Sequence, residues 1–532
     1  MTIPRDRQDP VIEPKAEAPS TTGTNAGSAA AHGRPSIGRQ MAKGAAWTVS
    51  MRMTIRVIGL ISMAILARLL VPADFGLVAM ATMVWAALEA MGEFSFDVAL
   101  IQNQAAGRRE YDTVWTMTII RGMVLALLLF ALAGPAAAFF REPRLEAIFH
   151  VLALMPVIQG FANVGVVDFQ KHLRFDKDFA FMVGVKISGF LVTVPLAFLL
   201  RSYWALVAGI VTGRIAQLVL SYVLHPHRPR LTLVRWRHIF DFSKWLVASN
   251  FIGFVRERLD TFTIGRLLGA QALGVYSIAY EIASLVTSEL IAPIRRALLP
   301  GYSKLAHDLE LIRKSYLDGL ALIVLIALPV AVGIGVVADP LVRLLLGNKW
   351  LDVIPLIKIL MVFGIFSTME ANAGPVFLAL GRPAINMTLN LVTLVVLVPA
   401  VLIGGNLWGL PGIAWAVTLG AGVLMILSIE TVKRLLRFPL VALTNNLWRP
   451  TLAVSAMAAA VIGFRGFQNF GNGVPGLFAQ LTGSVVLGAL VYILAIWVLW
   501  RISGTPNGTA ERHLIDAVMP KIRKYIPIVT RI

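Results

Sequence analysis

Residues Ala67–Leu77 read ARLLVPADFGL, and residues Gly265–Val275 read GRLLGAQALGV. Both stretches place Arg-Leu-Leu before a turn, and both end on a glycine followed by an apolar residue. Each copy ends one long apolar segment and begins the next, so the repeat predicts the same hairpin corner in two related halves of the chain. We therefore expect a duplicated bundle of membrane helices.

The composition is typical of a membrane protein. Of 532 residues, 57% are hydrophobic and 14% are charged, and the mean hydropathy is +0.75. A soluble core of this size needs less apolar content. The chain has no cysteine, which excludes disulfides, thiolate metal sites and cysteine nucleophiles. The formal net charge is +19, but the basic residues lie mostly in short segments between apolar runs, where they orient a multispanning protein.

Apolar segments long enough to cross about 30 Å of hydrocarbon follow one another from Gly44 onward. We expect about fourteen spans, with the two copies of the repeat at the ends of the first and seventh. An even number of spans between the copies makes the halves parallel, related by an axis along the membrane normal. Ala162–Gly165 (ANVG) and Ala371–Gly374 (ANAG) form a second echo, whose larger offset we assign to an insertion around Leu341–Trp350.

The expected architecture is an all-α integral membrane protein with two parallel six-helix lobes around a central cavity and two C-terminal helices. The first residues are rich in Pro, Ala, Ser, Thr and Gly and predict a disordered tail. The predicted segments are a cytoplasmic tail (1–43), an N-lobe (44–224), a basic cytoplasmic inter-lobe loop (225–244), a C-lobe (245–431), two further helices (447–500) and a basic cytoplasmic tail (501–532).

The loops between the spans predict the orientation. With the N-terminus inside, the cytoplasmic loops hold about twenty Lys and Arg and the opposite loops hold about six. Arg68 and Arg266 then lie at the outer ends of their helices, where a cation complements the helix C-terminus, and we interpret both as structural. We interpret Asn163 and Asn372 as donors of hydrogen bonds between helices, because each lies close to a small glycine.

Charged residues inside the predicted spans are the candidate site, because each costs about 2.5–3.5 kcal/mol at bilayer depth unless it is paired or hydrated. Arg52 and Arg56 are one helical turn apart and repel each other, which favours an anionic ligand. Arg256 and Asp260 have the same spacing and opposite charge, so we expect an internal ion pair there. The whole set predicts a hydrated cavity between the halves. It comprises mainly cations in the first half (Arg52, Arg56, Arg121, Lys186, Arg214) and a mixed set in the second (Arg256, Glu257, Arg258, Asp260, Glu281, Glu289, Lys358, Glu370).

Several sequence signals of enzymes are missing. The chain has no phosphate-binding Gly-Lys-Ser/Thr loop, no zinc-type histidine pair and no polar segment large enough for an ATPase domain. The longest loops are basic, whereas a membrane glycosyltransferase or polymerase would need a large polar loop with catalytic carboxylates. We therefore expect no enzyme activity, no catalytic residues, no cofactor and no metal.

Several motifs, taken in order, resemble those of one transporter family. They are Ala67–Met80 (ARLLVPADFGLVAM), Val98–Gln102 (VALIQ), Leu268–Tyr280 (LGAQALGVYSIAY), Pro300 before Ser303–Leu305 (SKL), Leu346–Trp350 (LGNKW) and Ala379–Pro383 (ALGRP). From Gly44 to about Trp500 the chain resembles the polysaccharide transporter family of Wzx-type oligosaccharide flippases. This family belongs to the MOP flippase superfamily, together with the lipid II flippase and the MATE exporters. Glu93 and Asp97, just before VALIQ, depart from the family pattern, and we assign them no role.

The resemblance implies an ion-coupled flippase of the bacterial inner membrane that works by alternating access. Its substrate would be an undecaprenyl-diphosphate-linked oligosaccharide for exopolysaccharide, capsule or lipopolysaccharide. Its other partners would be membrane lipids, a polysaccharide polymerase and export machinery, with no nucleic acid. Cavity cations would balance the diphosphate, and carboxylates would couple to the ion gradient. The substrate-binding candidates are Arg52, Arg56, Arg121, Lys186, Arg214, Arg256 and Arg258, and the ion-coupling candidates are Glu257, Asp260, Glu281 and Glu370.

Two alternatives remain open. A MATE-like exporter of small cations would have a cavity dominated by carboxylates and aromatic residues. A non-transporting scaffold of a polysaccharide synthase would have no need of charge in the middle of the membrane.

Overall fold

The computed structural model describes residues 37–92, 100, 107–234, 253–467, 471, 473–504 and 512, and these form helices joined by short turns. Ten of the described helices are long and apolar enough to cross a membrane, or eleven if the bent pair Arg144–Gly160 and Val164–Lys171 is one further span. The prediction of an all-helical membrane protein is therefore confirmed, while the count of fourteen spans stays a prediction. The expectations for Glu93, Asp97 and most residues of the two tails lie outside the described residues.

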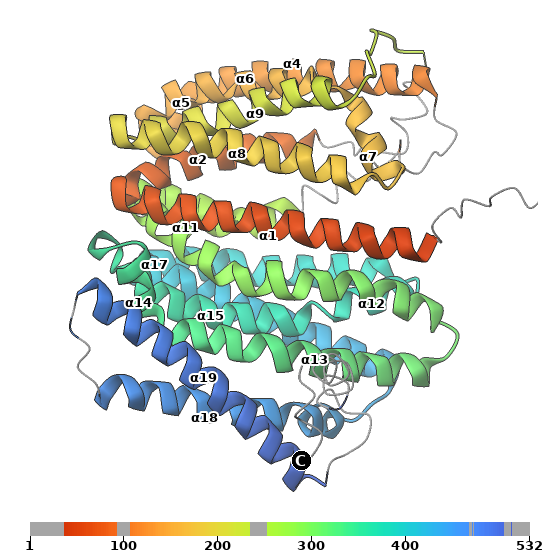
Figure 1. Cartoon of the computed structure of the whole chain (residues 1–532), viewed down its shortest axis with the longest axis vertical. Coiled ribbons are helices and arrows are strands. Elements are labelled where there is room, and N and C mark those ends of the chain that lie inside the picture. Colours follow the sequence, from red (N-terminus) through yellow and green to blue (C-terminus); the bar gives the residue numbers. More distant parts are fainter. Residues whose placement is uncertain are drawn as a thin grey trace, which may run out of the picture.

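The first-half helices occupy the upper part of Figure 1. Helix α1 begins at Ile37, before the expected start at Gly44, so the backbone of residues 37–43 is helical rather than part of a disordered tail. The helices of this half are α1 (Ile37–Leu69), α2 (Pro72–Met91), α4 (Arg108–Phe140), α5 (Arg144–Leu152), α6 (Leu154–Gly160), η1 (Val164–Val166), α7 (Val167–Lys171), α8 (Phe175–Leu200) and α9 (Trp204–Leu224).

The second-half helices lie beside the first, in the middle of Figure 1. Residues 253–267 are helical and lead into this half. The following elements are α11 (Gly269–Leu285), the π-helical turn η2 (Val286–Ile291), α12 (Ala292–Lys304), α13 (Leu309–Val336), α14 (Ala338–Leu345), η3 (Asn348–Trp350), α15 (Val353–Glu370), α16 (Ala373–Ala379) and α17 (Pro383–Leu436).

Helix α17 is divided by Gly409, whose φ of 60° is left-handed and favours glycine. A Cβ placed on Gly404 would lie 2.7 Å from the carbonyl oxygen of Gly412, and one on Gly420 would lie 2.8 Å from the Leu397 side chain. The two arms of α17 therefore run side by side as a hairpin, and glycine permits their close approach.

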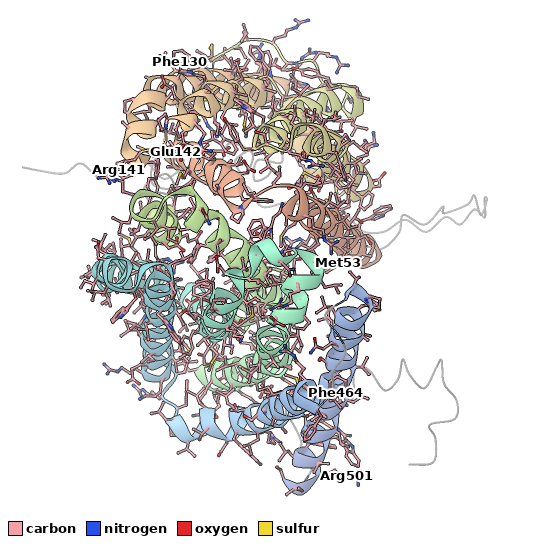
Figure 2. All side chains as sticks on the ribbon, turned by 90° about the vertical axis from the view of Figure 1, so that its left-hand side faces the viewer. Met53, Phe130, Arg141, Glu142, Phe464 and Arg501 are labelled. Atoms are coloured by element: carbon pink, nitrogen blue, oxygen red, sulfur yellow. The ribbon has the colours of Figure 1, made fainter. Side chains whose placement is uncertain are left out.

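The last two helices, α18 (Leu440–Phe467) and α19 (Val474–Ile502), pack on each other and against α13 and α14. They form the lower part of the molecule in Figure 1 and Figure 2. The Arg465 guanidinium lies 3.5 Å from an Asp339 carboxylate oxygen, which ties α18 to α14. Apolar side chains such as Met53 and Phe130 are exposed on the sides of the bundle, as expected of a surface that faces lipid.

The repeated stretch forms the corner of each half at one end of the bundle, on the left of Figure 1. We call this the corner end. In the first copy the extended residue Val71 precedes Pro72, which starts α2 with a φ already suited to a helix, and the Val71 N–H donates to Asp74 Oδ2 at 3.2 Å. In the second copy the turn uses Gly269, whose φ is 80°.

The two corners also pack against each other, because α2 lies directly on α11. A Cβ on Gly76 would lie 1.7 Å from the carbonyl oxygen of Ala270, and one on Gly274 would lie 1.8 Å from that of Pro72. Gly76 and Gly274 hold the same place in the two copies, as do Pro72 and Ala270. The repeat therefore makes a contact with approximate two-fold symmetry, in which two glycines let the backbones of the halves touch.

Candidate functional site

Arg56 connects the two halves of the molecule midway along α1. Its Nη1 donates to Glu281 Oε1 at 2.8 Å, and its Nε lies 3.7 Å from Glu289 Oε1. Glu281 lies on α11 and Glu289 on the π-helical turn η2, so both carboxylates come from the second half. The Nε and Nη2 atoms of Arg56 are buried without a hydrogen-bond partner. One hydrogen bond and two opposite charges therefore hold the guanidinium, while its Nε and Nη2 donors stay unused.

Two further cations lie near Arg56. Arg52 is one helical turn before it on α1 and is partly exposed. The Nζ atom of Lys186 on α8 lies 3.9 Å from the Cβ position of Gly59, about one turn after Arg56. Neither Arg52 nor Lys186 has an ion pair with any residue that the structure describes. Three of the predicted substrate-binding cations therefore lie along the middle of α1, two on this helix and the third on the neighbouring α8.

The remaining first-half candidates lie around Glu89 and Trp85 of α2. The Nη2 of Arg121 lies 3.7 Å from Glu89 Oε1, which also accepts a hydrogen bond from Gln159 Nε2 at 3.3 Å. The guanidinium of Arg214 lies over the Trp85 ring, 4.9 Å from its centroid, and donates to Gln217 Oε1 at 3.0 Å. The structure separates Arg121 and Arg214, whose guanidinium groups have first-half partners, from Arg56.

Lys186 and Arg214 line the same cavity. It has a volume of about 410 Å³ and lies between α1, α2, α8 and α9, and its wall includes the polar residues Ser62, Thr193 and Gln217. The sequence analysis expects a hydrated cavity between the halves, whereas this cavity lies within the first half.

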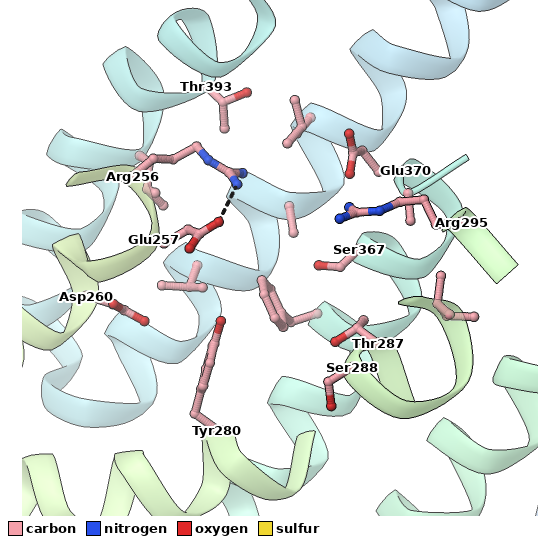
Figure 3. Close-up of a pocket in the computed structure, with 18 residues that line it drawn as sticks. Arg256, Glu257, Asp260, Tyr280, Thr287, Ser288, Arg295, Ser367, Glu370 and Thr393 are labelled. Atoms are coloured by element: carbon pink, nitrogen blue, oxygen red, sulfur yellow. Dashed lines mark ion pairs between the residues drawn. The ribbon is translucent and has the colours of Figure 1, made fainter. Parts of the chain in front are cut away.

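The second half contains a polar pocket of about 400 Å³, shown in Figure 3. Arg256, Glu257 and Asp260 line one side, and Arg295 and Glu370 line the other. The rest of the wall includes the hydroxyl groups of Tyr280, Thr287, Ser288, Ser367 and Thr393. Three of the four predicted ion-coupling carboxylates therefore gather in one pocket, whereas Glu281 pairs with Arg56.

The predicted ion pair between Arg256 and Asp260 is wrong. Arg256 Nη2 instead lies 3.5 Å from Glu257 Oε1 (Figure 3). Asp260 is buried and accepts hydrogen bonds from the Tyr276 hydroxyl at 2.5 Å and from the Thr261 N–H at 2.6 Å. Asp260 turns toward α11 because a buried carboxylate needs donors close at hand. Arg258 is exposed and makes no hydrogen bond or ion pair with a described residue.

The expected insertion around Leu341–Trp350 lies at the corner end and contacts the first half. The indole Nε1 of the fully buried Trp350 donates to the carbonyl oxygen of Ala67 at 2.7 Å, and its ring meets Phe75 edge-on at 5.2 Å. Arg68 donates to the carbonyl oxygens of Leu344 and Leu345 at the end of α14. Arg68 therefore caps a helix of the other half, which is a structural role as expected.

Asn372 makes the predicted hydrogen bonds between helices, whereas the side chain of Asn163 bonds to the segment that follows α9. Asn163 is buried, its backbone N–H donates to the Ser221 hydroxyl oxygen on α9 at 2.9 Å, and its Nδ2 donates to the His227 carbonyl at 2.7 Å. Asn372 is also buried, donates to the Tyr316 carbonyl at 2.9 Å and accepts from the Tyr302 hydroxyl at 2.7 Å.

The first residues of the predicted inter-lobe loop fold back onto the first half. His225 Nε2 lies 3.3 Å from an Asp168 oxygen, and His227 Nε2 lies 3.3 Å from an Asp112 oxygen. Burial holds the pKa of the His225 imidazole below its ordinary value, although the neighbouring Asp168 acts in the opposite direction. This part of the loop is therefore attached to α4 and α7.

Some site residues were missed by reasoning from the sequence. Glu89 was not singled out although it lies inside a predicted span, and its place in the span was the available signal. Arg295 was not singled out either, because it follows directly after a predicted span, yet its side chain lines the second-half pocket.

Each half of this bundle of membrane-spanning helices thus has its own group of charges, and Arg56 joins the halves through Glu281 and Glu289. The family model described as polysaccharide biosynthesis protein matches residues 65–355, more than half of the chain. The chain belongs to this family.

Relatives of this polysaccharide biosynthesis protein carry related names. It is 26% identical over 382 residues to the lipopolysaccharide biosynthesis protein WzxC of Escherichia coli strain K12, covering 71% of this chain and 78% of the relative. It is 24% identical over 467 residues to the teichuronic acid biosynthesis protein TuaB of Bacillus subtilis strain 168, covering 87% and 96%. It is also 24% identical over 469 residues to the succinoglycan biosynthesis transport protein ExoT of Rhizobium meliloti strain 1021, covering 87% and 92%.

Two solved structures share the fold of this polysaccharide biosynthesis protein. The lipid II flippase MurJ in an inward closed conformation matches with a TM-score of 0.67 at 13% identity, covering 85% of this chain and 98% of MurJ. An inward-facing multidrug resistance MATE family transporter of the MOP superfamily matches with a TM-score of 0.59 at 16% identity, covering 72% and 94%. At these identities the matches show the fold alone.

Proposed function

We propose that this polysaccharide biosynthesis protein is a flippase that moves undecaprenyl-diphosphate-linked oligosaccharide across the bacterial inner membrane. The names of its relatives support the polysaccharide class, and the flippase and exporter folds support transport rather than catalysis. In this proposal residues 44–224 and 245–431 are two parallel six-helix lobes around a central cavity, with both tails in the cytoplasm and fourteen spans in all.

The observation that carries the proposal is the state of Arg56. A guanidinium between the two lobes, with two buried nitrogen atoms that lack a hydrogen-bond partner, can donate to the oxygens of an anionic headgroup. Arg52 precedes it and the Lys186 ammonium lies near the following turn, so the headgroup would meet further positive charge. The lipid tail would stay in the bilayer while the diphosphate crosses along this part of α1.

The places where the lobes touch support alternating access. The glycine contact between α2 and α11 and the Trp350 hydrogen bond both lie at the corner end, which the loop charges predict to be the outer face. The structure would then represent a state closed toward the outside. The second-half pocket with Glu257, Asp260 and Glu370 would bind the coupling ion, and release of that ion would change the balance between the two states.

The experiment measures translocation directly. The full-length protein is reconstituted into liposomes that contain a lipid-linked oligosaccharide, and a membrane-impermeant enzyme or lectin reports the fraction that reaches the other leaflet. We expect wild-type protein to accelerate translocation, and Arg52→Ala combined with Arg56→Ala to remove the acceleration at equal protein levels. If the doubly substituted protein translocates like wild type, the arginine site is wrong; if wild-type protein is inactive, the flippase proposal fails.

One observation favours a MATE-like exporter of small cations as the second candidate. The second-half pocket combines carboxylates with the aromatic rings of Tyr280 and Phe363, as that alternative predicts. A deletion strain discriminates the two functions. Increased susceptibility to cationic drugs favours the exporter, whereas accumulation of lipid-linked oligosaccharide on the cytoplasmic side favours the flippase.

A further inference from the structure

Helix α11 changes its geometry between the two carboxylates that contact Arg56. Glu281 and Glu289 are eight residues apart, and in a regular α-helix residues at this spacing point about 80° away from each other. The residues Val286–Ile291 form a π-helical turn, which accommodates one extra residue. The spacing then becomes equivalent to seven residues of α-helix, or about 20°. The π-helical turn therefore brings both carboxylates to the same guanidinium.

The resulting contact has two negative groups for one positive group. The Nη1 of Arg56 is bonded to Glu281, while the 3.7 Å from its Nε to Glu289 is too long for a hydrogen bond. Both Nε and Nη2 of Arg56 remain buried and unsatisfied. An anion with more acceptor oxygens, arranged around two centres of charge, would satisfy this guanidinium better than the two carboxylates do.

A diphosphate has this pattern of charge and acceptors. We propose that Glu281 and Glu289 are internal counter-ions that occupy Arg56 in the empty protein and are displaced by the diphosphate of the substrate. The proposal rests on the proposed function and deepens it, because it names the groups that neutralise Arg56 when no substrate is bound. The two carboxylates repel a diphosphate, so the carboxylates and the diphosphate cannot occupy the same arginine together.

Displacement would have a consequence for the lobes. Arg56 belongs to α1, and both carboxylates belong to the α11–η2 segment of the other half. A diphosphate bound at Arg56 therefore breaks an ion pair that joins the halves midway along α1. The same segment places Thr287 and Ser288 in the wall of the second-half pocket, so movement of η2 would also change the shape of that pocket. Glu281 and Glu289 act as positioning residues that select for a doubly charged headgroup.

The test measures binding of diphosphate to the full-length protein in lipid nanodiscs by titration calorimetry. The probes are inorganic pyrophosphate, farnesyl diphosphate and inorganic phosphate. For the combined variant Glu281→Gln and Glu289→Gln we expect about tenfold tighter binding of both diphosphates, since two competing ion pairs are removed. We expect a smaller gain for inorganic phosphate, because it places one phosphorus centre at the arginine. Equal gains for pyrophosphate and farnesyl diphosphate would locate recognition in the headgroup, and a gain for farnesyl diphosphate alone would show that the lipid chain is also needed.

Two controls make the result specific. Arg56→Gln, added to the combined variant, should abolish the gain, because the carboxylates act through that arginine. Glu430→Gln should leave binding unchanged, since Glu430 pairs with Lys433 and Arg434 near the end of α17. A variant that was only structurally damaged would bind more weakly, which is the opposite of the expected change.

The outcomes separate this proposal from the flippase function. If the combined variant binds diphosphate no more tightly than wild type, or binds none, the counter-ion proposal is overturned, while the liposome translocation of wild-type protein still decides the proposed function. If the gain appears equally in protein that carries Arg56→Gln, the carboxylates do not act through Arg56 and the proposal is also overturned.

Discussion

Substitution of Gly76 by alanine should weaken the contact that closes the corner end. The new Cβ would lie 1.7 Å from the Ala270 carbonyl oxygen, whereas real Cβ contacts are essentially never under 3.0 Å. Helices α2 and α11 must therefore part by at least 1.3 Å, the difference between these two distances. Overpacking of this kind costs about 1–3 kcal/mol, which shifts the equilibrium between closed and open corner ends by about 5- to 150-fold.

The absence of native cysteine makes this shift measurable by pulsed electron paramagnetic resonance. Leu199 and Leu407 are exposed and lie on different halves. Leu199 is near the end of α8, which packs on the first corner, and Leu407 is near the turn of α17, which packs on the second. Each is replaced by cysteine and spin-labelled, and the distances between labels are recorded. Wild-type protein should give mainly one short distance, and Gly76→Ala should add a longer component.

Two further substitutions sharpen this experiment. Gly274→Ala should produce the same longer component, because its Cβ would lie 1.8 Å from the Pro72 carbonyl oxygen in the other copy of the repeat. Gly134→Ala is the matched control, since a Cβ there meets nothing within 4 Å. If all three variants give the wild-type distances, or if Gly134→Ala shifts them equally, the glycine contact does not hold the corner end closed.

Two other predictions concern the second-half pocket and the start of the inter-lobe loop. Asp260→Asn keeps the size of a buried group that accepts from Tyr276 and Thr261, but removes its charge, so gradient-driven translocation should fall to the rate without a gradient while pyrophosphate binding stays within about twofold. Unchanged stimulation of translocation by an imposed ion gradient would refute a coupling role for Asp260. For His225, the pKa in the folded protein is below that of the unfolded chain, so the unfolded chain binds more protons as the pH falls through about 6.5 and stability decreases. The melting temperature should therefore be lower at pH 5.5 than at pH 7.5. His225→Asn should reduce this difference, and the exposed His307→Asn should not; an equal pH dependence in both variants would contradict the interpretation.

Much of the fold could be predicted because it depends on signals that are local in the sequence. Long apolar segments must form helices in a bilayer, since each backbone polar group needs a partner within its own segment. The repeat at Ala67–Leu77 and Gly265–Val275 located two corners, and the structure shows that these corners touch through Gly76 and Gly274. The prediction that Asn372 bonds between helices is confirmed for the same reason, because a buried amide beside small residues must find donors and acceptors nearby, whereas Asn163 finds its acceptor after the end of α9.

The sequence by itself therefore determined a membrane-spanning helical bundle, its duplicated corners and the set of charges inside it. Only the tertiary structure decided how those charges are paired. Spacing along one helix predicted a pair between Arg256 and Asp260, yet Arg256 lies against Glu257, and Arg56 pairs with a carboxylate 225 residues away. The physical reason is that the partner of a buried charge depends on which helix faces cross and at what depth. A single π-helical turn was enough to rotate Glu289 toward Arg56, and helical periodicity along the sequence does not reveal it.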